Sequence, residues 1–111
     1  MAEKYDLKNG ISRLLLRLTR ERGIEIDKII IFGSFVKGNH RRGSDIDIAI
    51  ISRSFRDKSL FARVKMATGI NRELVRKFQV PVDLLYYSDH EWQKGASPFV
   101  AEIKSYGEII I

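Results

Sequence analysis

The segment from Ile29 to Ile51 constrains the fold of this chain more than any other. Its first residues, Ile29–Phe32, form an unbroken apolar run, which is typical of a strand buried on both faces. Gly33 interrupts the run, and Ser34 follows at the position of a helix N-cap. Such a turn gathers backbone amides and a hydroxyl in one small volume, and this favours an anion such as phosphate.

A second strand is predicted over Asp45–Ile51, where acidic and apolar residues alternate before the segment becomes wholly apolar. Residues two apart on a strand share one face, so Asp45 and Asp47 point the same way, about 6.5 to 7 Å apart at the backbone. Two like charges so placed repel each other unless a cation lies between them. Oxygen ligands favour Mg²⁺, which usually takes one or two carboxylates together with substrate phosphates. The segment therefore predicts a metal-assisted phosphate site.

A third strand, predicted over Val80–Tyr87, carries one carboxylate among apolar neighbours, Asp83. An unpaired buried carboxylate is costly, which makes this residue a candidate for function. Beside the strand of Asp45 and Asp47, it would complete a three-carboxylate site by holding a second metal or accepting the proton of an attacking hydroxyl. The alternative is an edge-strand residue that faces solvent.

The spacing of these residues resembles the signature of a known family. The pattern is Gly33-Ser34, ten intervening residues and then Asp45-Ile46-Asp47. It is similar to the motif of the minimal nucleotidyltransferases, small members of the polymerase-beta-like superfamily. The resemblance extends from about Ile29 to the C-terminus, because the acidic third strand and the tail from Ser97 also resemble the family. One departure is Lys37, where members often carry Arg, so the charge is kept without the planar fork that grips phosphate.

The resemblance implies a fold and an activity. The fold is expected to be α+β, with a small mixed sheet of three to four strands covered by helices, in a single domain over residues 1–111. The activity is expected to be Mg²⁺-dependent transfer of a nucleoside monophosphate, with AMP from ATP as first candidate, to a hydroxyl acceptor. Small members of the family are often encoded beside a helical HEPN-domain toxin and add AMP to one of its tyrosines. The resemblance therefore implies a protein adenylyltransferase in a toxin–antitoxin pair.

The matching positions give the expected site residues. Those expected to bind the nucleotide and its phosphates are Gly33, Ser34, Lys37 and Ser44. Those expected to be catalytic, and to hold two Mg²⁺ ions with the bound nucleotide, are Asp45, Asp47 and Asp83.

Helices are predicted around these strands. The first has apolar residues at helical spacing, namely Leu7, Ile11, Leu14, Leu15 and Leu18. A second apolar stripe is expected to pack on the sheet, with a bend or break at Gly69. Its residues are Leu60, Phe61, Val64, Ala67, Ile70, Leu74, Val75 and Phe78. The last helix is predicted over Ser97–Lys104, before a short strand at Ile109–Ile111, and Trp92 is expected to cover the core.

Composition narrows the remaining function classes. The chain has no cysteine, which fits a reducing compartment, and no apolar run near the ~20 residues of a membrane helix, so a cytoplasmic location is expected. The net charge of +6 is concentrated in Arg53–Lys77, with eight basic residues against two acidic ones. An alternative is therefore a non-catalytic binding or regulatory subunit with the same fold, which binds nucleic acid through this segment. The sequence leaves homo-oligomerisation open.

Overall fold

The structure, a computed structural model, describes residues 3–37, 45–95 and 97–111. Its helices are α1 (Glu3–Glu21), α2 (Ser34–Lys37), α3 (Leu60–Met66), α4 (Ile70–Phe78), α5 (Asp89–Lys94) and α6 (Pro98–Tyr106), with a short 3-10 helix, η1 (Arg53–Phe55). Its strands are β1 (Lys28–Phe32), β2 (Ile46–Ile51), β3 (Val82–Tyr87) and β4 (Glu108–Ile109). None of the described helices is both long and apolar enough to cross a membrane.

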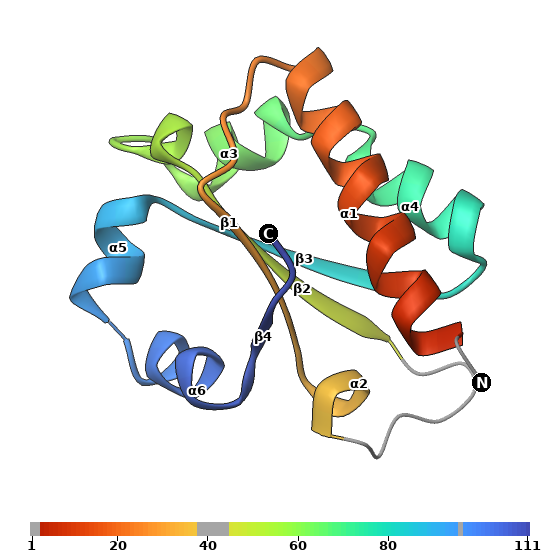
Figure 1. The fold of residues 1–111 in the computed structure, drawn as a ribbon. Coiled ribbons are helices and arrows are strands. Elements are labelled where there is room, and N and C mark those ends of the chain that lie inside the picture. The colour runs from red at the N-terminus through yellow and green to blue at the C-terminus, as the bar shows by residue number, and fades with distance from the viewer. Residues whose placement is uncertain (1–2, 38–44, 96) are drawn as a thin grey trace.

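The strands form one mixed sheet in the order β3-β2-β1-β4, which confirms the predicted α+β class (Figure 1). β1 pairs antiparallel with β2 and places Phe32 opposite Asp47. β2 pairs in parallel with β3 and places Asp47 opposite Asp83. Parallel neighbours need a long crossover connection, and α3 and α4 lie within it. The register thus places the end of β1 beside the starts of β2 and β3.

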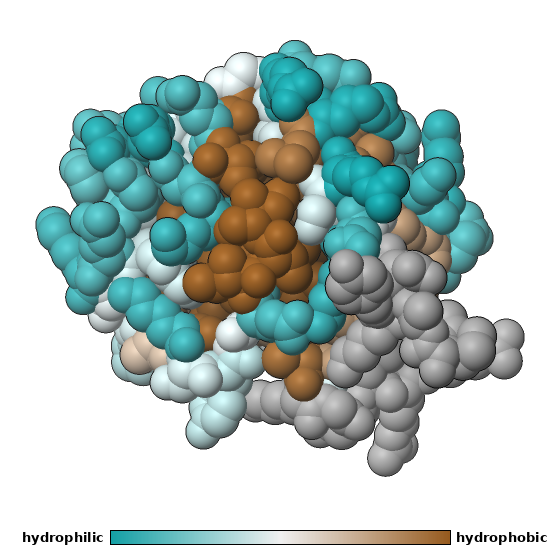
Figure 2. Space-filling model, in the orientation of Figure 1, coloured by the Kyte–Doolittle hydropathy of each residue, from teal (hydrophilic) through white to brown (hydrophobic). Residues whose placement is uncertain are grey.

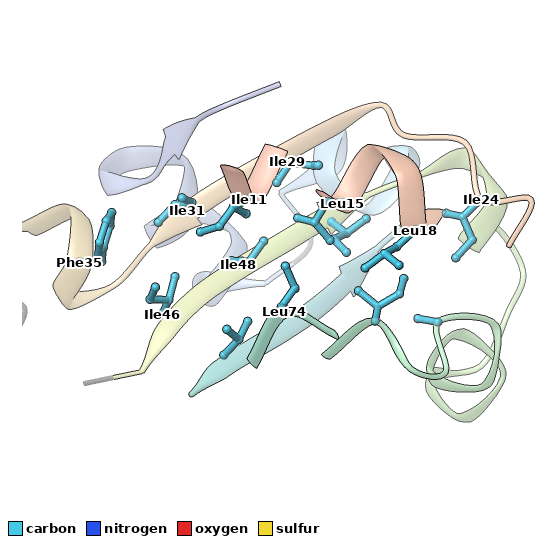
Figure 3. Packing of buried hydrophobic residues seen from close by; sticks show 14 of the residues in the cluster. Ile11, Leu15, Leu18, Ile24, Ile29, Ile31, Phe35, Ile46, Ile48 and Leu74 are labelled. Carbon is cyan, nitrogen blue, oxygen red and sulfur yellow. The ribbon is translucent and has the colours of Figure 1, made fainter. Parts of the chain in front are cut away.

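Each face of the sheet has its own hydrophobic core. The first core lies between the sheet and the helices α1 and α4, and its residues include Ile11, Leu15, Leu18, Ile29, Ile31, Ile46, Ile48, Ile50, Ile70 and Leu74 (Figure 3). The second core lies under α5 and α6, and its residues are Ile30, Phe32, Ala49, Ile51, Trp92, Val100 and Ile103. Trp92 is buried as predicted. Because side chains alternate along β2, Asp47 lies on the face of the second core.

The predicted apolar stripe over residues 60–78 is broken and only its second half packs on the sheet. Gly69, with a φ of +90°, separates α3 from α4. In α4, Ile70 and Leu74 are buried. In α3, however, Leu60, Phe61 and Val64 are exposed by 68%, 76% and 49%. The prediction that the whole stripe packs on the sheet is wrong for α3, because the side chain that this helix buries is Arg63.

Hydrophobic surface also gathers over the middle of the molecule in Figure 2, where Figure 1 shows β4 and the C-terminus. Hydrophilic surface flanks it on both sides, over α1 on one side and over α5 and α6 on the other. The isoleucine of β4, Ile109, is 58% exposed. β4 is thus a short edge strand that leaves its one apolar side chain, that of Ile109, in contact with solvent.

Candidate active site

The structure brings together the three carboxylates that the sequence singles out. Asp47 and Asp83 are direct neighbours on parallel strands, which lie about 4.8 Å apart. Asp45 immediately precedes β2 and interacts with Asp83. Burial raises the pKa of Asp47, and the charges of Asp83 and Asp45 raise it further. The pKa of Asp83 is raised by hydrogen bonding with Asp45, by burial and by the charge of Asp45.

Asp83 differs from its prediction in one respect. The sequence suggested a buried carboxylate, but β3 is an edge strand and Asp83 is exposed. The residue nevertheless lies beside Asp47, so it faces solvent on an edge strand and also neighbours the other carboxylates. An exposed carboxylate at the edge is accessible to a second substrate from solvent.

The chemistry of these donors fits Mg²⁺. Three like charges in contact repel one another, and a divalent cation relieves that repulsion. Within the described residues, no group of three or more His, Cys, Asp or Glu side chains is placed so that it could hold a metal ion by itself. Mg²⁺ commonly takes only one or two carboxylates and completes its six ligands with water and substrate phosphates, so a partial set of protein ligands suits it.

The turn between β1 and α2 lies directly against Asp47. Gly33 has a φ of +77°, in the left-handed region that favours glycine. A Cβ at this position would overlap the Oδ2 atom of Asp47, so both the conformation and the space require glycine. Ser34 then begins α2, and the amide of Val36 donates to the Gly33 carbonyl at 3.2 Å. The predicted order of strand, glycine turn and short helix is confirmed.

The other two predicted phosphate ligands cannot be placed in the same way. Lys37 is the last residue of α2, but its side chain lies outside the described part of the structure. Ser44 belongs to the segment 38–44, which also lies outside the described residues. Both residues stay predictions.

A cavity of about 470 Å³ opens beside the carboxylates, within the size range of ligand sites. Its lining residues are Phe32, Gly33, Asp47, Asp83, Leu84, Leu85, Phe99, Glu102, Ile103 and Tyr106. Gly33, Asp47 and Asp83 lie on one side of it, and α6 contributes both apolar residues and the carboxylate of Glu102. The Phe99 ring meets the Phe32 ring edge to face, with centroids 6.0 Å apart. The cavity therefore joins a charged site to an aromatic wall.

The sequence reading missed the contribution of α6 to this cavity. It predicted a terminal helix near residues 97–104 but assigned no site residue to it. Phe99, Ile103 and Tyr106 recur at helical spacing and lie on one face. Ile103 is buried, whereas Phe99 and Tyr106 are exposed by 46% and 58%. The sequence signal was the helical spacing of these residues, but only the structure shows that the two aromatic side chains are exposed beside the carboxylates.

The basic segment is less available to a nucleic acid than its composition suggests. Arg53 pairs with Asp27 at 2.9 Å, and Arg56 pairs with Asp89. Arg63 is buried and pairs with Glu91. Three of the eight basic residues of the segment are therefore paired with carboxylates of the same chain.

Comparisons with known proteins agree with this geometry. The family model of the nucleotidyltransferase domain matches residues 11–109. No curated protein matches the sequence.

Several solved structures share the fold. A toxin–antitoxin structure with AMP-PNP has a TM-score of 0.60 at 24% identity, over 89% of this chain and 71% of that one. A Sulfolobus solfataricus protein described as a nucleotidyltransferase has a TM-score of 0.58 at 18% identity, over 96% and 84% of the two chains. A tri-AMPylated Shewanella oneidensis HEPN toxin in complex with MNT antitoxin has a TM-score of 0.57 at 20% identity, over 97% and 71%. At these identities the likeness concerns the fold.

Proposed function

Because the chain belongs to the nucleotidyltransferase domain family, we propose that it transfers AMP from ATP to an acceptor hydroxyl at the carboxylates Asp45, Asp47 and Asp83. The observation that carries this proposal is that Asp47, Asp83 and the Gly33 turn line one cavity, with Asp45 next to the two carboxylates. A structural role for such a cluster is disfavoured, since like charges in contact destabilise a fold. A phosphate-transfer site explains why all three are present.

The turn and α2 would bind the triphosphate. Gly33 leaves room for a phosphate to approach the main chain, and Ser34 offers a hydroxyl and an amide to the β and γ phosphates. Lys37 and Ser44 would add further phosphate contacts. The apolar part of the cavity would hold the nucleobase against Phe99 of α6. This arrangement directs the α phosphorus toward the carboxylates.

The exposed carboxylate of Asp83 would face the acceptor. It is exposed on an edge strand beside Asp47, so it can take the proton of the attacking hydroxyl. A bond then forms between the acceptor oxygen and the α phosphorus, the bond from that phosphorus to the bridging oxygen breaks, and pyrophosphate leaves. Asp45, Asp47 and Asp83 would hold Mg²⁺, which when bound would neutralise the charge that develops on the phosphates.

We propose that the acceptor is a tyrosine of a small helical HEPN-domain partner, in a toxin–antitoxin pair. The support is that solved structures with this fold include a toxin–antitoxin structure with AMP-PNP and a tri-AMPylated HEPN toxin bound to an MNT antitoxin. We also propose that the protein is cytoplasmic and that residues 1–111 form a single domain.

Calorimetric titration of ATP tests the nucleotide site. Wild type should bind ATP with Mg²⁺ and lose binding in EDTA, whereas the double variant Asp45→Asn/Asp47→Asn should not bind in either condition. Asp57→Asn is the matched control, because Asp57 is an exposed carboxylate in a left-handed turn that asparagine also adopts. ATP binding that is unchanged in the double variant would refute the site.

Transfer is tested with ATP labelled at the α phosphate and a purified HEPN-domain partner. Wild type should leave label on the partner and release pyrophosphate, and mass spectrometry should locate AMP on a tyrosine. Asp83→Asn should abolish labelling because this change removes the proposed base, while ATP should still bind through Mg²⁺ held by Asp45 and Asp47. Labelling of a small-molecule hydroxyl but never of the protein would refute the proposed acceptor.

A further inference from the structure

The helix α3 turns much of its apolar face away from the sheet and toward solvent. An amphipathic helix normally turns its apolar face to the core, but three large apolar residues of α3 face solvent, and only Met66 packs against the first core. The α3 face is defined as the exposed side chains of Leu60, Phe61 and Val64. Positions 60, 61 and 64 are neighbours on one side of a helix, so these side chains form one contiguous surface.

Interactions of Arg63 hold the helix in this orientation. The guanidinium group donates from Nε to the Lys58 carbonyl and from Nη1 to the Tyr86 carbonyl, both at 3.0 Å. Nη1 also contacts Glu91 Oε1 at 2.7 Å, and the group lies 5.9 Å from the centre of the Phe55 ring. Arg63 is only 8% exposed, so these bonds are made in a partly dry environment. The bonds of Arg63 thus fix the orientation of α3 in which its apolar side chains point outward.

Two lysines, Lys58 and Lys65, lie beside the α3 face in the sequence, and Asp57 directly precedes the first of them. From Lys58 to Arg72 the chain contains no acidic residue. Lys58 and Lys65 are exposed, and Lys65 Nζ lies 6.0 Å from the centre of the Phe61 ring. No ion pair engages either lysine among the residues that the structure describes. Arg56, by contrast, is already neutralised by Asp89.

We propose that the α3 face is a docking surface for a partner protein that presents an apolar helix with acidic side chains along its flanks. Burial of Leu60, Phe61 and Val64 would supply the affinity, and carboxylates opposite Lys58 and Lys65 would supply the specificity. A second copy of this chain fits less well, because an isologous contact through α3 would bring the same lysines together.

This surface is separate from the carboxylate site. Asp83 lies near the start of β3, whereas Arg63 binds the carbonyl of Tyr86 near the end of that strand. Figure 1 accordingly shows α3 and α2 at opposite ends of the sheet. A partner on α3 therefore leaves the cavity open, and the inference stands whether or not the proposed catalytic activity is correct.

Binding of two synthetic helical peptides tests the proposal. Both peptides have the same leucine face, and their flanks carry glutamate in one and lysine in the other. Fluorescence anisotropy should show that the acidic peptide binds wild type at least tenfold more tightly than the basic one. The variant Leu60→Ser/Phe61→Ser should weaken binding at least tenfold, and Lys58→Glu/Lys65→Glu should reverse the preference.

The controls separate docking from misfolding and from self-association. Leu16→Ser removes a 37% exposed leucine from α1 and should leave peptide binding unchanged. All variants replace exposed residues, and their thermal unfolding should match that of wild type. The proposal is overturned if neither peptide binds, if both bind equally, or if sedimentation shows a wild-type dimer that Leu60→Ser/Phe61→Ser dissociates.

Discussion

Replacing Arg63 with alanine should destabilise the fold by about 3 kcal/mol. The bonds to the carbonyls of Lys58 and Tyr86 contribute about 1 kcal/mol each, since both lie in a partly buried environment. The ion pair with Glu91 adds no more than about 1 kcal/mol, because the Glu91 side chain is 42% exposed. For a domain of this size, 1 kcal/mol corresponds to about 4 °C, so Tm should fall by about 12 °C.

Thermal and urea unfolding, followed by far-UV circular dichroism, measure this loss. Arg63→Lys keeps the charge but not the planar fork, so it should lose about half as much stability. Lys65→Ala changes an exposed cation on the same helix and should change the free energy of unfolding by less than about 0.5 kcal/mol. If Arg63→Ala unfolds at the wild-type temperature, the guanidinium bonds do not fix α3, and the explanation of its outward apolar face is wrong.

Three further substitutions test the site and the packing around it. Asp47→Asn should raise the free energy of unfolding by about 1 kcal/mol at pH 7, because it removes repulsion with Asp83 that solvent partly screens. The pKa of Asp47 is higher in the folded chain than its ordinary value of 3.8, so ionised Asp47 destabilises the fold above the folded pKa. The stability gained by Asp47→Asn should therefore vanish as pH falls toward 3.8. Urea titrations at several pH values would contradict this reasoning if the gain in stability grew in acid. Gly33→Ala should reduce ATP affinity more than tenfold by calorimetry, because the new Cβ would overlap the Asp47 carboxylate. Gly23→Ala is the control and should leave ATP affinity unchanged, because Gly23 has a similar left-handed backbone but no neighbour within 4 Å. Gly107→Ala places a Cβ 2.5 Å from a carbonyl of α6 and from an isoleucine of β1, so thermal unfolding should show a loss of about 1 to 3 kcal/mol, and a wild-type Tm would mean that this junction yields easily.

The strand–turn–strand unit could be predicted from sequence because its signals are local. The apolar run that ends at Phe32 and the alternation that begins at Asp45 each specify a strand without help from distant residues. Gly33 marks the turn for a reason that the structure makes explicit, namely a positive φ and the closeness of Asp47. Because the positive φ at position 33 favours glycine, the glycine in the sequence indicates the turn.

The orientation of α3 could not be predicted because it depends on distant partners. Leu60, Phe61 and Val64 have the spacing of a buried face, and periodicity alone assigns them to the core. The competing interaction is the bond from Arg63 to a carbonyl 23 residues away on β3, together with the pair to Glu91 on α5. No local pattern reveals such bonds, so the helix had to be placed in three dimensions before its outward face was visible.

The carboxylate site depends on both a local sequence pattern and a contact between distant strands. Asp45 and Asp47 share a strand, so their common direction follows from the sequence, but only the parallel register of β2 and β3 brings Asp83 beside them. A carboxylate that stabilises a fold is normally paired with a cation or a donor, and its removal lowers stability. These carboxylates face one another, so Asp47→Asn should stabilise the fold while abolishing the Mg²⁺-dependent binding of ATP. Opposite signs for stability and binding at one residue distinguish a site kept for function from one kept for the fold.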